Sequence, residues 1–288
     1  DPDAPIIHIF TSGTTGEPKG VSLPVKALSC IEAYGEFAYD LRQTDVFWNA
    51  ADPGWAYGLY CGILATLTTG TPAILFEGGF SAQATIDIIE KQKITNFAAA
   101  PTVYRSLRAD GIKISNKHKL RCLSSAGEPL TPEINEWAKS FFGLSVHDHY
   151  GQTETSMVIN NHHHPELKTK LRDGSMGKVM PGWSATVLKN DEDIPEKPGI
   201  PGRVAFIIDK SPFFWFAGYI GNPKKSAEKF SKNKKYYLTG DTGSVDKDGY
   251  YYFSTRDDDI IIMAGYRIGP FEVESALSTH NAVAECAV

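Results

Sequence analysis

The pattern of apolar and polar residues changes character partway along the chain. From residue 6 to about 150, short apolar runs alternate with stretches of helical spacing. The apolar runs predict strands at 6–10, 47–50, 73–76, 96–100 and 144–147, the first of them buried. Helices are predicted at 25–39, at 81–91 behind an N-capping Ser81, and from Pro132 onward. This alternation favours an α/β fold with a mostly parallel sheet and flanking helices.

From about residue 174, short β-rich segments separated by Gly and Pro dominate the pattern. They fall at 185–188, 203–208, 236–238 and 249–253, and turn signals such as Asp248-Gly249 separate them. These segments predict a smaller antiparallel sheet or distorted barrel. Beyond Arg256, an apolar run at 260–263 and a helix from Pro270 to about residue 280 predict a third, α+β region.

Composition and charge narrow the class of protein. The 288 residues are 42% hydrophobic and 22% charged, as in a soluble globular protein without a membrane span. The net charge of −5 argues against nucleic acid as a partner, and the lysines between 224 and 235 are interpreted as a solvated face. Four cysteines without CxxC spacing predict reduced, packed thiols and a cytoplasmic location. The histidines at 162–164 are interpreted as a polar loop in preference to a zinc site.

A loop rich in glycine and hydroxyl side chains carries the strongest chemical signal. It follows the first strand, runs from Thr11 to Gly20, and combines three glycines and four hydroxyls with Lys19. Glycine lets backbone N–H groups approach an anion, and the hydroxyls and the ammonium add donors and charge. The loop is therefore a candidate phosphate cradle, although the order Pro18-Lys19-Gly20 is not that of the common NTPase P-loop. Its candidate ligands are Thr11, Ser12, Gly13, Thr14, Thr15, Gly16 and Lys19.

This loop resembles the phosphate loop of the adenylate-forming, or AMP-binding, superfamily. Further segments match motifs of that superfamily in the same order, at 125–130, at 150–154, and at 237–241 leading to 254–259 and 265–267. The resemblance covers nearly the whole chain and is strongest to medium-chain and acetyl acyl-CoA synthetases. It implies that a carboxylic acid is activated with ATP and Mg²⁺ to an acyl-adenylate plus pyrophosphate. The acyl group then passes to coenzyme A.

The resemblance also implies a domain organisation. In the family, a large N-terminal region precedes the phosphate loop, and a small C-terminal domain with a catalytic lysine follows. We therefore expect an internal fragment that is inactive or weakly active alone. Its parts would be a nucleotide- and acyl-binding core at 1–173, a β-rich subdomain at 174–256, and the start of the mobile C-terminal domain at 257–288. In that last part, Asp258 matches the hinge, and Gly265 and Arg267 match coenzyme A contacts.

Matching positions further imply roles in adenylation. Lys19, Thr153 and Glu154 match catalytic positions, with Thr153 on the α-phosphate and Glu154 on Mg²⁺. One carboxylate suffices because Mg²⁺ relies mainly on the phosphates of its substrate. The implied nucleotide contacts are Gly127, Glu128 and Pro129 along the adenine, Tyr150 stacked on it, Asp241 on the ribose hydroxyls, Arg256 on ribose or phosphate, and Gln152.

The predicted acyl pocket bears on the choice of acid. Trp55, Tyr57 and Gly58 match its lining, and Gly151 stands where acetate-specific relatives carry a tryptophan. A missing indole leaves space for several methylenes, each worth roughly 0.8 kcal/mol when buried, so a medium-chain or branched acid is favoured. The alternatives are an acetyl- or short-chain enzyme, an adenylation domain that loads a carrier protein, and a nucleotide-binding fragment without activity. The exact acid stays open, as does the oligomeric state, for which a homo-oligomer is one option.

Overall fold

A computed structural model describes residues 1–11, 18–256, 261–263, 266–268 and 270–278, together with the single residues 280, 283, 286 and 288. Several predicted site residues lie outside the described part of the chain: Ser12, Gly13, Thr14, Thr15, Gly16, Asp258 and Gly265. Arg267 falls on the short strand β15 (Tyr266–Ile268), which pairs with β14 (Ile261–Met263).

The first part of the chain alternates strands and helices as its pattern predicts. In chain order its elements are β1 (Pro5–Thr11), β2 (Lys19–Pro24), α1 (Ala27–Phe37), β3 (Phe47–Asn49), the π-helix η1 (Gly58–Ala65), α2 (Thr66–Thr69), β4 (Ala73–Ile74), α3 (Ala82–Lys91), β5 (Asn96–Ala98), α4 (Pro101–Ala109), β6 (Cys122–Ala126), α5 (Pro132–Phe142), β7 (Val146–Gln152) and β8 (Ser156–Asn160). The predicted cap is present, since Ser81 Oγ accepts from the N–H of Ala84 at 3.4 Å. Pro101 does not merely end a strand, because it also opens α4.

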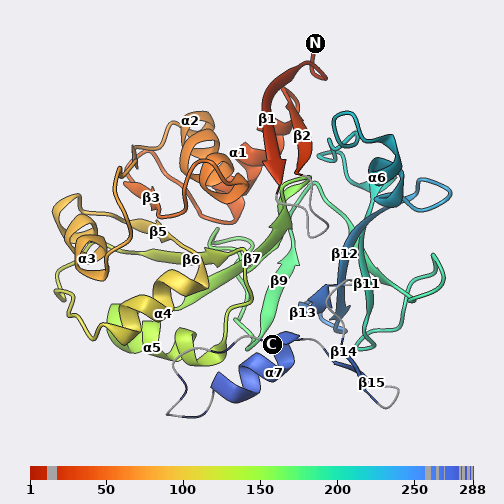
Figure 1. The fold of residues 1–288 in the computed structure, drawn as a ribbon. Helices are drawn as coiled ribbons and strands as arrows, with labels where there is room; N and C mark the ends of the chain where they lie inside the picture. Colours follow the sequence, from red (N-terminus) through yellow and green to blue (C-terminus); the bar gives the residue numbers. More distant parts are fainter. Residues whose placement is uncertain are drawn as a thin grey trace.

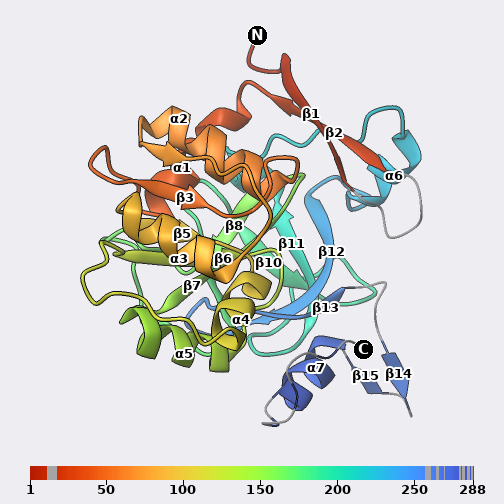
Figure 2. The ribbon, with the colours of Figure 1, turned by 60° about the vertical axis from the view of Figure 1, so that its left-hand side comes forward.

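The second part is mostly β-structure. Its elements are β9 (Ser175–Val179), β10 (Ala185–Leu188), β11 (Gly202–Ile207), the 3₁₀ helix η2 (Ile208–Lys210), α6 (Pro223–Glu228), β12 (Tyr236–Val245), β13 (Tyr251–Arg256), β14, β15 and α7 (Pro270–Ser278). In Figures 1 and 2, α7 and the β14–β15 pair lie together near the end of β13. No helix in the described ranges is long and apolar enough to cross a membrane.

One continuous order of hydrogen-bonded strands joins the two parts: β10-β11-β12-β13-β9-β8-β7-β6-β5-β3-β4. The strands from β4 to β7 pair in parallel, and the strands from β7 to β10 pair antiparallel (Figure 1). The α/β prediction with its antiparallel extension is therefore confirmed, but the antiparallel strands continue the parallel sheet instead of standing apart from it. β9 makes the join because it pairs with both β8 and β13.

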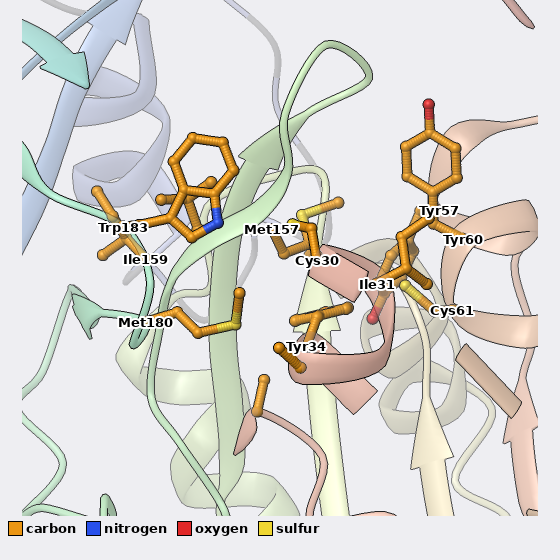
Figure 3. Close-up of a cluster of buried hydrophobic side chains, with 14 of the residues drawn as sticks. Cys30, Ile31, Tyr34, Tyr57, Tyr60, Cys61, Met157, Ile159, Met180 and Trp183 are labelled. Carbon is orange, nitrogen blue, oxygen red and sulfur yellow. The ribbon is translucent and has the colours of Figure 1, made fainter. Parts of the chain in front are cut away.

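Two hydrophobic clusters cover the two faces of the parallel strands. Helices α3, α4 and α5 pack on one face through side chains such as Ile86, Leu107 and Ile134. Helix α1 and η1 pack on the other face, and Figure 3 shows Tyr34 and its neighbours on α1 between the η1 residues and β8. Parallel strands need cover on both faces, and here both are covered.

The first strand differs from its prediction. The apolar pattern predicts a buried strand, yet Ile6 is 42% exposed and Phe10 is 63% exposed. Within the described ranges β1 pairs with β2 alone, in a two-stranded ribbon, and Ile6 and Phe10 lie on its exposed face. The ribbon is attached near its tip, where the N–H of Ile220 donates to the carbonyl of Gly20 at 2.8 Å. In both ribbon views it therefore lies beside α6 (Figures 1 and 2).

Candidate active site

A cavity of about 600 Å³ brings together residues from distant parts of the sequence. That volume is in the usual range for a site that binds a small molecule. It lies at the carboxyl ends of β6 and β7, between the β1–β2 ribbon and β12–β13. Most predicted site residues that the structure describes line it: Thr11, Lys19, Trp55, Tyr57, Gly127, Glu128, Pro129, Tyr150, Gly151, Gln152, Thr153, Glu154, Asp241 and Arg256.

Asp241, on β12, is a buried carboxylate that accepts hydrogen bonds from two residues of β7. The carboxylate accepts from the Tyr150 hydroxyl at 2.5 Å and from Gln152 Nε2 at 2.8 Å, while only 7% of the residue is exposed. Burial raises the pKa of Asp241, and the hydrogen bond from Tyr150 acts in the opposite direction. Because Tyr150 is tethered to Asp241, the ring predicted to stack on adenine and the carboxylate predicted to hold ribose form one unit.

Glu154 has a partner that the sequence did not indicate. Its Oε1 accepts from the hydroxyl of Tyr219 at 2.5 Å, and both residues are buried. Lys19 lies against the same tyrosine, with its Nζ 5.1 Å from the centre of the ring. Tyr219 also forms a bridge with Val21 of β2. It therefore ties the ribbon that carries the phosphate loop to the carboxylate predicted to hold the metal.

The donor set around Glu154 fits Mg²⁺ bound to a nucleotide. Among the described residues, no group of three or more His, Cys, Asp or Glu could hold an ion without help. A single buried carboxylate that faces a cavity suits a cation whose other ligands are phosphate oxygens and water. Glu154 would hold such an ion, with the Tyr219 hydroxyl fixing the orientation of the carboxylate.

The neighbouring motif residues are fixed by the elements around them. The hydroxyl of Tyr60 on η1 donates to the carbonyl of Thr153 at 2.8 Å. The Glu128 carboxylate accepts from Thr102 at 2.8 Å and from Arg105 at 2.8 Å, both on α4. Since that carboxylate is engaged with α4, the backbone of 127–129 is the part of this segment best suited to contact a base. Gly127, at φ +96°, has a backbone conformation that favours glycine.

Two glycines of the predicted acyl pocket lie close against the backbone of other segments. Among the described residues that line the cavity, Gly58 is absent, and a Cβ on it would lie 2.2 Å from the carbonyl oxygen of Asp52. Its role is therefore to let η1 start against the preceding loop. Gly151 does line the cavity, but a Cβ there would lie 2.0 Å from the carbonyl oxygen of Ser156. The backbone of β8 thus fills the place where the sequence predicts room left by the missing indole.

The other two acyl candidates sit at different depths. Trp55 is 73% exposed, at the mouth of the cavity. Tyr57 is buried and accepts a hydrogen bond from the hydroxyl of Tyr39 at 3.2 Å. Tyr39 in turn accepts from Tyr34, whose hydroxyl lies 2.9 Å from His149 Nδ1. The deeper part of the cavity wall is therefore backed by hydroxyl groups.

The segment 162–164, which the sequence predicts to be a polar loop, is enclosed by the protein. The segment forms no strand, but His162 and His163 are buried, and burial lowers the pKa of His162 to about 4. The His163 ring stacks on His147 with centroids 3.6 Å apart. These histidines are packed behind β7 as neutral groups, which the polarity of the segment concealed.

Sequence reasoning missed four titratable residues of the cavity region: Asp148, His149, Tyr219 and Lys229. Asp148 and His149 directly precede the Tyr150 motif, so their position in the sequence was an available signal. The lysine-rich sequence around Lys229 predicts a solvated face, and this is wrong for Lys229 itself. That residue is partly buried, and its Nζ donates to the carbonyl of Thr239 at 2.7 Å.

Comparison with known proteins gives the class of protein that this site defines. Residues 1–209 match the family model described as AMP-binding enzyme. The chain therefore belongs to the AMP-binding enzyme family, and the resemblance carried by the motifs is confirmed.

Particular relatives narrow the comparison. The chain is 38% identical over 283 residues to the acyl-coenzyme A synthetase ACSM3, mitochondrial, of Rattus norvegicus, covering 97% of this chain and 47% of that protein. It is 38% identical over 290 residues to 4-hydroxybutyrate–CoA ligase 1 of Metallosphaera sedula, covering 98% and 49%. The crystal structure of an acyl-CoA synthetase from Brucella canis matches with a TM-score of 0.82 and 47% identity, over 100% of this chain and 52% of that one. The chain thus spans about half the length of the curated relatives it matches.

Proposed function

We propose that this chain is the nucleotide- and acyl-binding part of an AMP-forming acyl-CoA synthetase. The enzyme would join a carboxylic acid to AMP, release pyrophosphate, and pass the acyl group to coenzyme A. The observation that carries the proposal is the convergence of Lys19, Glu154 and Asp241 on one cavity, from three segments of the chain. A lysine and two buried carboxylates suit the phosphates, a metal ion and the ribose of one nucleotide.

Each of these residues is proposed to contact a different part of the nucleotide. Lys19 provides positive charge from β2 where phosphate charge increases as pyrophosphate leaves. Thr153 offers a hydroxyl to the α-phosphate, and Asp241 accepts from the ribose hydroxyls. Mg²⁺ bound at Glu154 would neutralise phosphate charge and orient the leaving group. Tyr219 and Tyr60 hold Glu154 and Thr153 in place.

The remaining contacts complete the proposal. Ser12, Gly13, Thr14, Thr15 and Gly16 would cradle the β- and γ-phosphates. Asp258 would be the hinge of the mobile domain, and Gly265 and Arg267 would meet coenzyme A in the thioester-forming pose. The part boundaries at 173/174 and 256/257 belong to the same proposal. The first of them falls just before β9, the strand that joins the two halves of the sheet.

A medium-chain or branched acid is the proposed substrate. Met157, Met176 and Phe253 give the cavity an apolar wall that suits methylene groups. The hydroxyl of Tyr57 favours a second candidate, an acid that carries a polar substituent, and one relative is named for 4-hydroxybutyrate. Acetate and a carrier-bound product are the remaining alternatives.

A reducing compartment is proposed for the protein, with the cytoplasm as the specific location. Cys30, Cys61 and Cys122 are buried free thiols, which fits such an environment. The rat relative is named as mitochondrial, so cell fractionation with compartment markers is the appropriate test. We propose small molecules alone as partners, with gel filtration to decide between a monomer and a homo-oligomer.

ATP–pyrophosphate exchange tests the proposed activity. The complete protein and the 288-residue chain are assayed with straight-chain acids of two to eight carbons, branched acids and 4-hydroxybutyrate. We expect exchange that depends on acid and Mg²⁺ in the complete protein, with six- to eight-carbon acids preferred, and little or none in the chain alone. Thioester formation with coenzyme A separates the synthetase from a carrier-loading domain. Absence of exchange with every acid, despite AMP binding, would favour a nucleotide-binding protein without this activity.

A further inference from the structure

Lys229 is turned inward from a lysine-rich surface. It is the residue after α6, close to Lys224 and Lys225, which belong to the outer face of that helix. Lys225 pairs with Glu228 at 3.0 Å, and those two side chains are 41% and 50% exposed. Lys229 instead lines the cavity, and its Nζ lies 5.5 Å from the centre of the Tyr237 ring. Its position after α6 therefore gives it a different environment from the rest of the cluster.

The amine lies directly over the Thr239–Asp241 turn. Its Nζ donates to the carbonyl of Thr239 at 2.7 Å and lies 3.6 Å from the point where a Cβ on Gly240 would be. In the described part of the chain, Thr239 provides the one hydrogen-bond acceptor seen for this amine. An ammonium group carries three N–H donors, so further donors are available to an anion in the cavity.

The charged side chains around Lys229 are those expected to contact the two ends of the nucleotide. Burial lowers the pKa of Lys229, and the carboxylates of Glu154 and Asp241 counter that effect, whereas Lys19 and Arg256 add to it. Glu154 and Lys19 belong to the metal and phosphate end, and Asp241 belongs to the ribose end. The α-phosphate of a nucleotide lies between its ribose and its outer phosphates. Lys229, which interacts with side chains assigned to both ends, is therefore placed near the α-phosphate.

The contact between α6 and β12 does not depend on this charge alone. The link between α6 and β12 is already made by backbone, since the N–H of Leu238 donates to the carbonyl of Lys229 at 2.8 Å. Removing an ammonium from water is costly, and an apolar side chain of similar length would fill the space without that cost. A bound anion would offset this desolvation cost through a charge-assisted hydrogen bond.

We infer that Lys229 binds the α-phosphate of the nucleotide, as a second cation in addition to Lys19. This inference rests on the proposed function, because it requires an adenine nucleotide in the cavity. It adds a phosphate ligand, from the residue after α6, to the contacts proposed for Lys19, for the loop after β1 and for Thr153. It also predicts that Lys229 distinguishes AMP from adenosine, a difference that a lysine with a purely structural role would not make.

Isothermal titration of the complete protein with AMP and with adenosine tests the inference. Lys229→Met should weaken AMP binding by about tenfold or more, the usual effect of losing a hydrogen bond to a charged group, and leave adenosine binding within about twofold. Lys229→Arg should restore most of the AMP affinity. Lys225→Met, on the adjoining helix α6, is the matched control and should change the binding of neither ligand.

The outcomes separate the inference from the function on which it rests. Equal weakening of AMP and adenosine would assign Lys229 a structural role, and unchanged AMP affinity would exclude the contact; either result overturns the inference. If the wild-type protein binds neither ligand, the proposed function fails and the inference fails with it.

A measurement on the wild-type protein covers the case in which Lys229→Met does not fold. Amine acetylation followed by mass spectrometry should find Lys229 protected by AMP but not by adenosine, with Lys225 labelled equally in both. Equal labelling of Lys229 with and without AMP would also overturn the inference.

Discussion

Two polar clusters lie on either side of strand β7, and they differ in charge. His147 and His149 are packed toward α1 and the 161–164 segment, where burial lowers the pKa of both, that of His147 to about 4. Tyr150 and Gln152, from the same strand, reach the carboxylate of Asp241 in the cavity. The two histidines thus make their hydrogen bonds within the protein, although His149 also borders the cavity, whereas Tyr150 and Gln152 hold a carboxylate in it.

The difference in charge follows from the hydrogen-bond partners that each cluster has. The histidines have protein partners, such as the carbonyl of Asn161 at 2.7 Å from His147 Nδ1, so a charge would only add a desolvation cost. Around the cavity, Glu154, Asp241 and Lys229 are placed close together despite that cost. Charged groups held in a cleft at the expense of stability are typical of a binding site. The comparison therefore teaches that a buried polar residue indicates function when it is charged and faces the cavity, and structure when it is neutral and packed.

The largest predicted effect is on catalysis and comes from a charged residue of the cavity. Glu154→Gln keeps the shape of the side chain but removes the charge that would hold Mg²⁺, so the rate of pyrophosphate exchange should fall about 10²–10³-fold, or ~3–4 kcal/mol. Adenosine binding should change little. The matched control is the exposed Glu166→Gln, for which wild-type exchange is expected. Near-normal exchange by Glu154→Gln would remove this carboxylate from the catalytic group.

The buried, neutral histidines predict that stability depends on pH. The pKa values of His147 and His162 are about 4 in the folded protein, below the unfolded value near 6.5. Both groups bind protons more readily when unfolded. The stability they contribute is therefore complete above pH 6.5 and is lost as the pH falls from 6.5 toward 4.

By pH 5 the expected loss is about 2 kcal/mol for each of these histidines. Urea unfolding of the complete protein between pH 7.5 and 4.5 measures it. His147→Phe should reduce the slope in this interval, and an unchanged slope would mean that this imidazole binds protons equally in the folded and unfolded states.

A methyl group at Gly151 tests whether the two sides are separated as tightly as the structure indicates. Gly151→Ala would bring a Cβ within 2.0 Å of the Ser156 carbonyl oxygen, so β8 would have to move. We expect a loss of about 1–3 kcal/mol in the free energy of unfolding. Gly79→Ala is the control, because among the described residues no heavy atom lies within 4 Å of its added Cβ. Equal melting temperatures for the two variants would contradict the close contact of β7 with β8.

The smallest predicted effect concerns the ribose contact. Asp241→Asn keeps an acceptor for Tyr150 but removes the negative charge, so ATP affinity should fall by about 1 kcal/mol. Calorimetry with ATP measures the change, and Asp248→Asn on an exposed turn serves as its control. An unchanged ATP affinity would place the ribose elsewhere and leave Asp241 as a structural partner of Tyr150.

Much of the fold could be predicted because it depends on local signals. Ser81 and Pro132 mark helix starts in the sequence, and the structure has helices there. Other predictions failed where a distant segment decided the outcome. The apolar first strand is largely exposed because, among the described residues, it pairs with β2 alone. His162 and His163 are buried because α1 and β7 enclose them.

The candidate site divides in the same way. Its residue types are carried by short motifs, so Lys19, Glu154 and Asp241 can be selected from the order of residues alone. Their environments cannot be predicted in this way. The Tyr219 hydrogen bond to Glu154 joins residues 65 positions apart, and no periodicity in the sequence indicates it.

The sequence by itself determined the family, the α/β character of the first part, the β-rich character of the second part, and the chemical groups available for a nucleotide. These features depend on neighbouring residues, whose spacing and caps act within a few positions along the chain. Only the tertiary structure decided that Lys229 faces the cavity, that the histidines are neutral, and that Gly151 is closed off by β8. Each of these depends on burial, and burial is set by which distant segments pack together, so no local pattern could fix it.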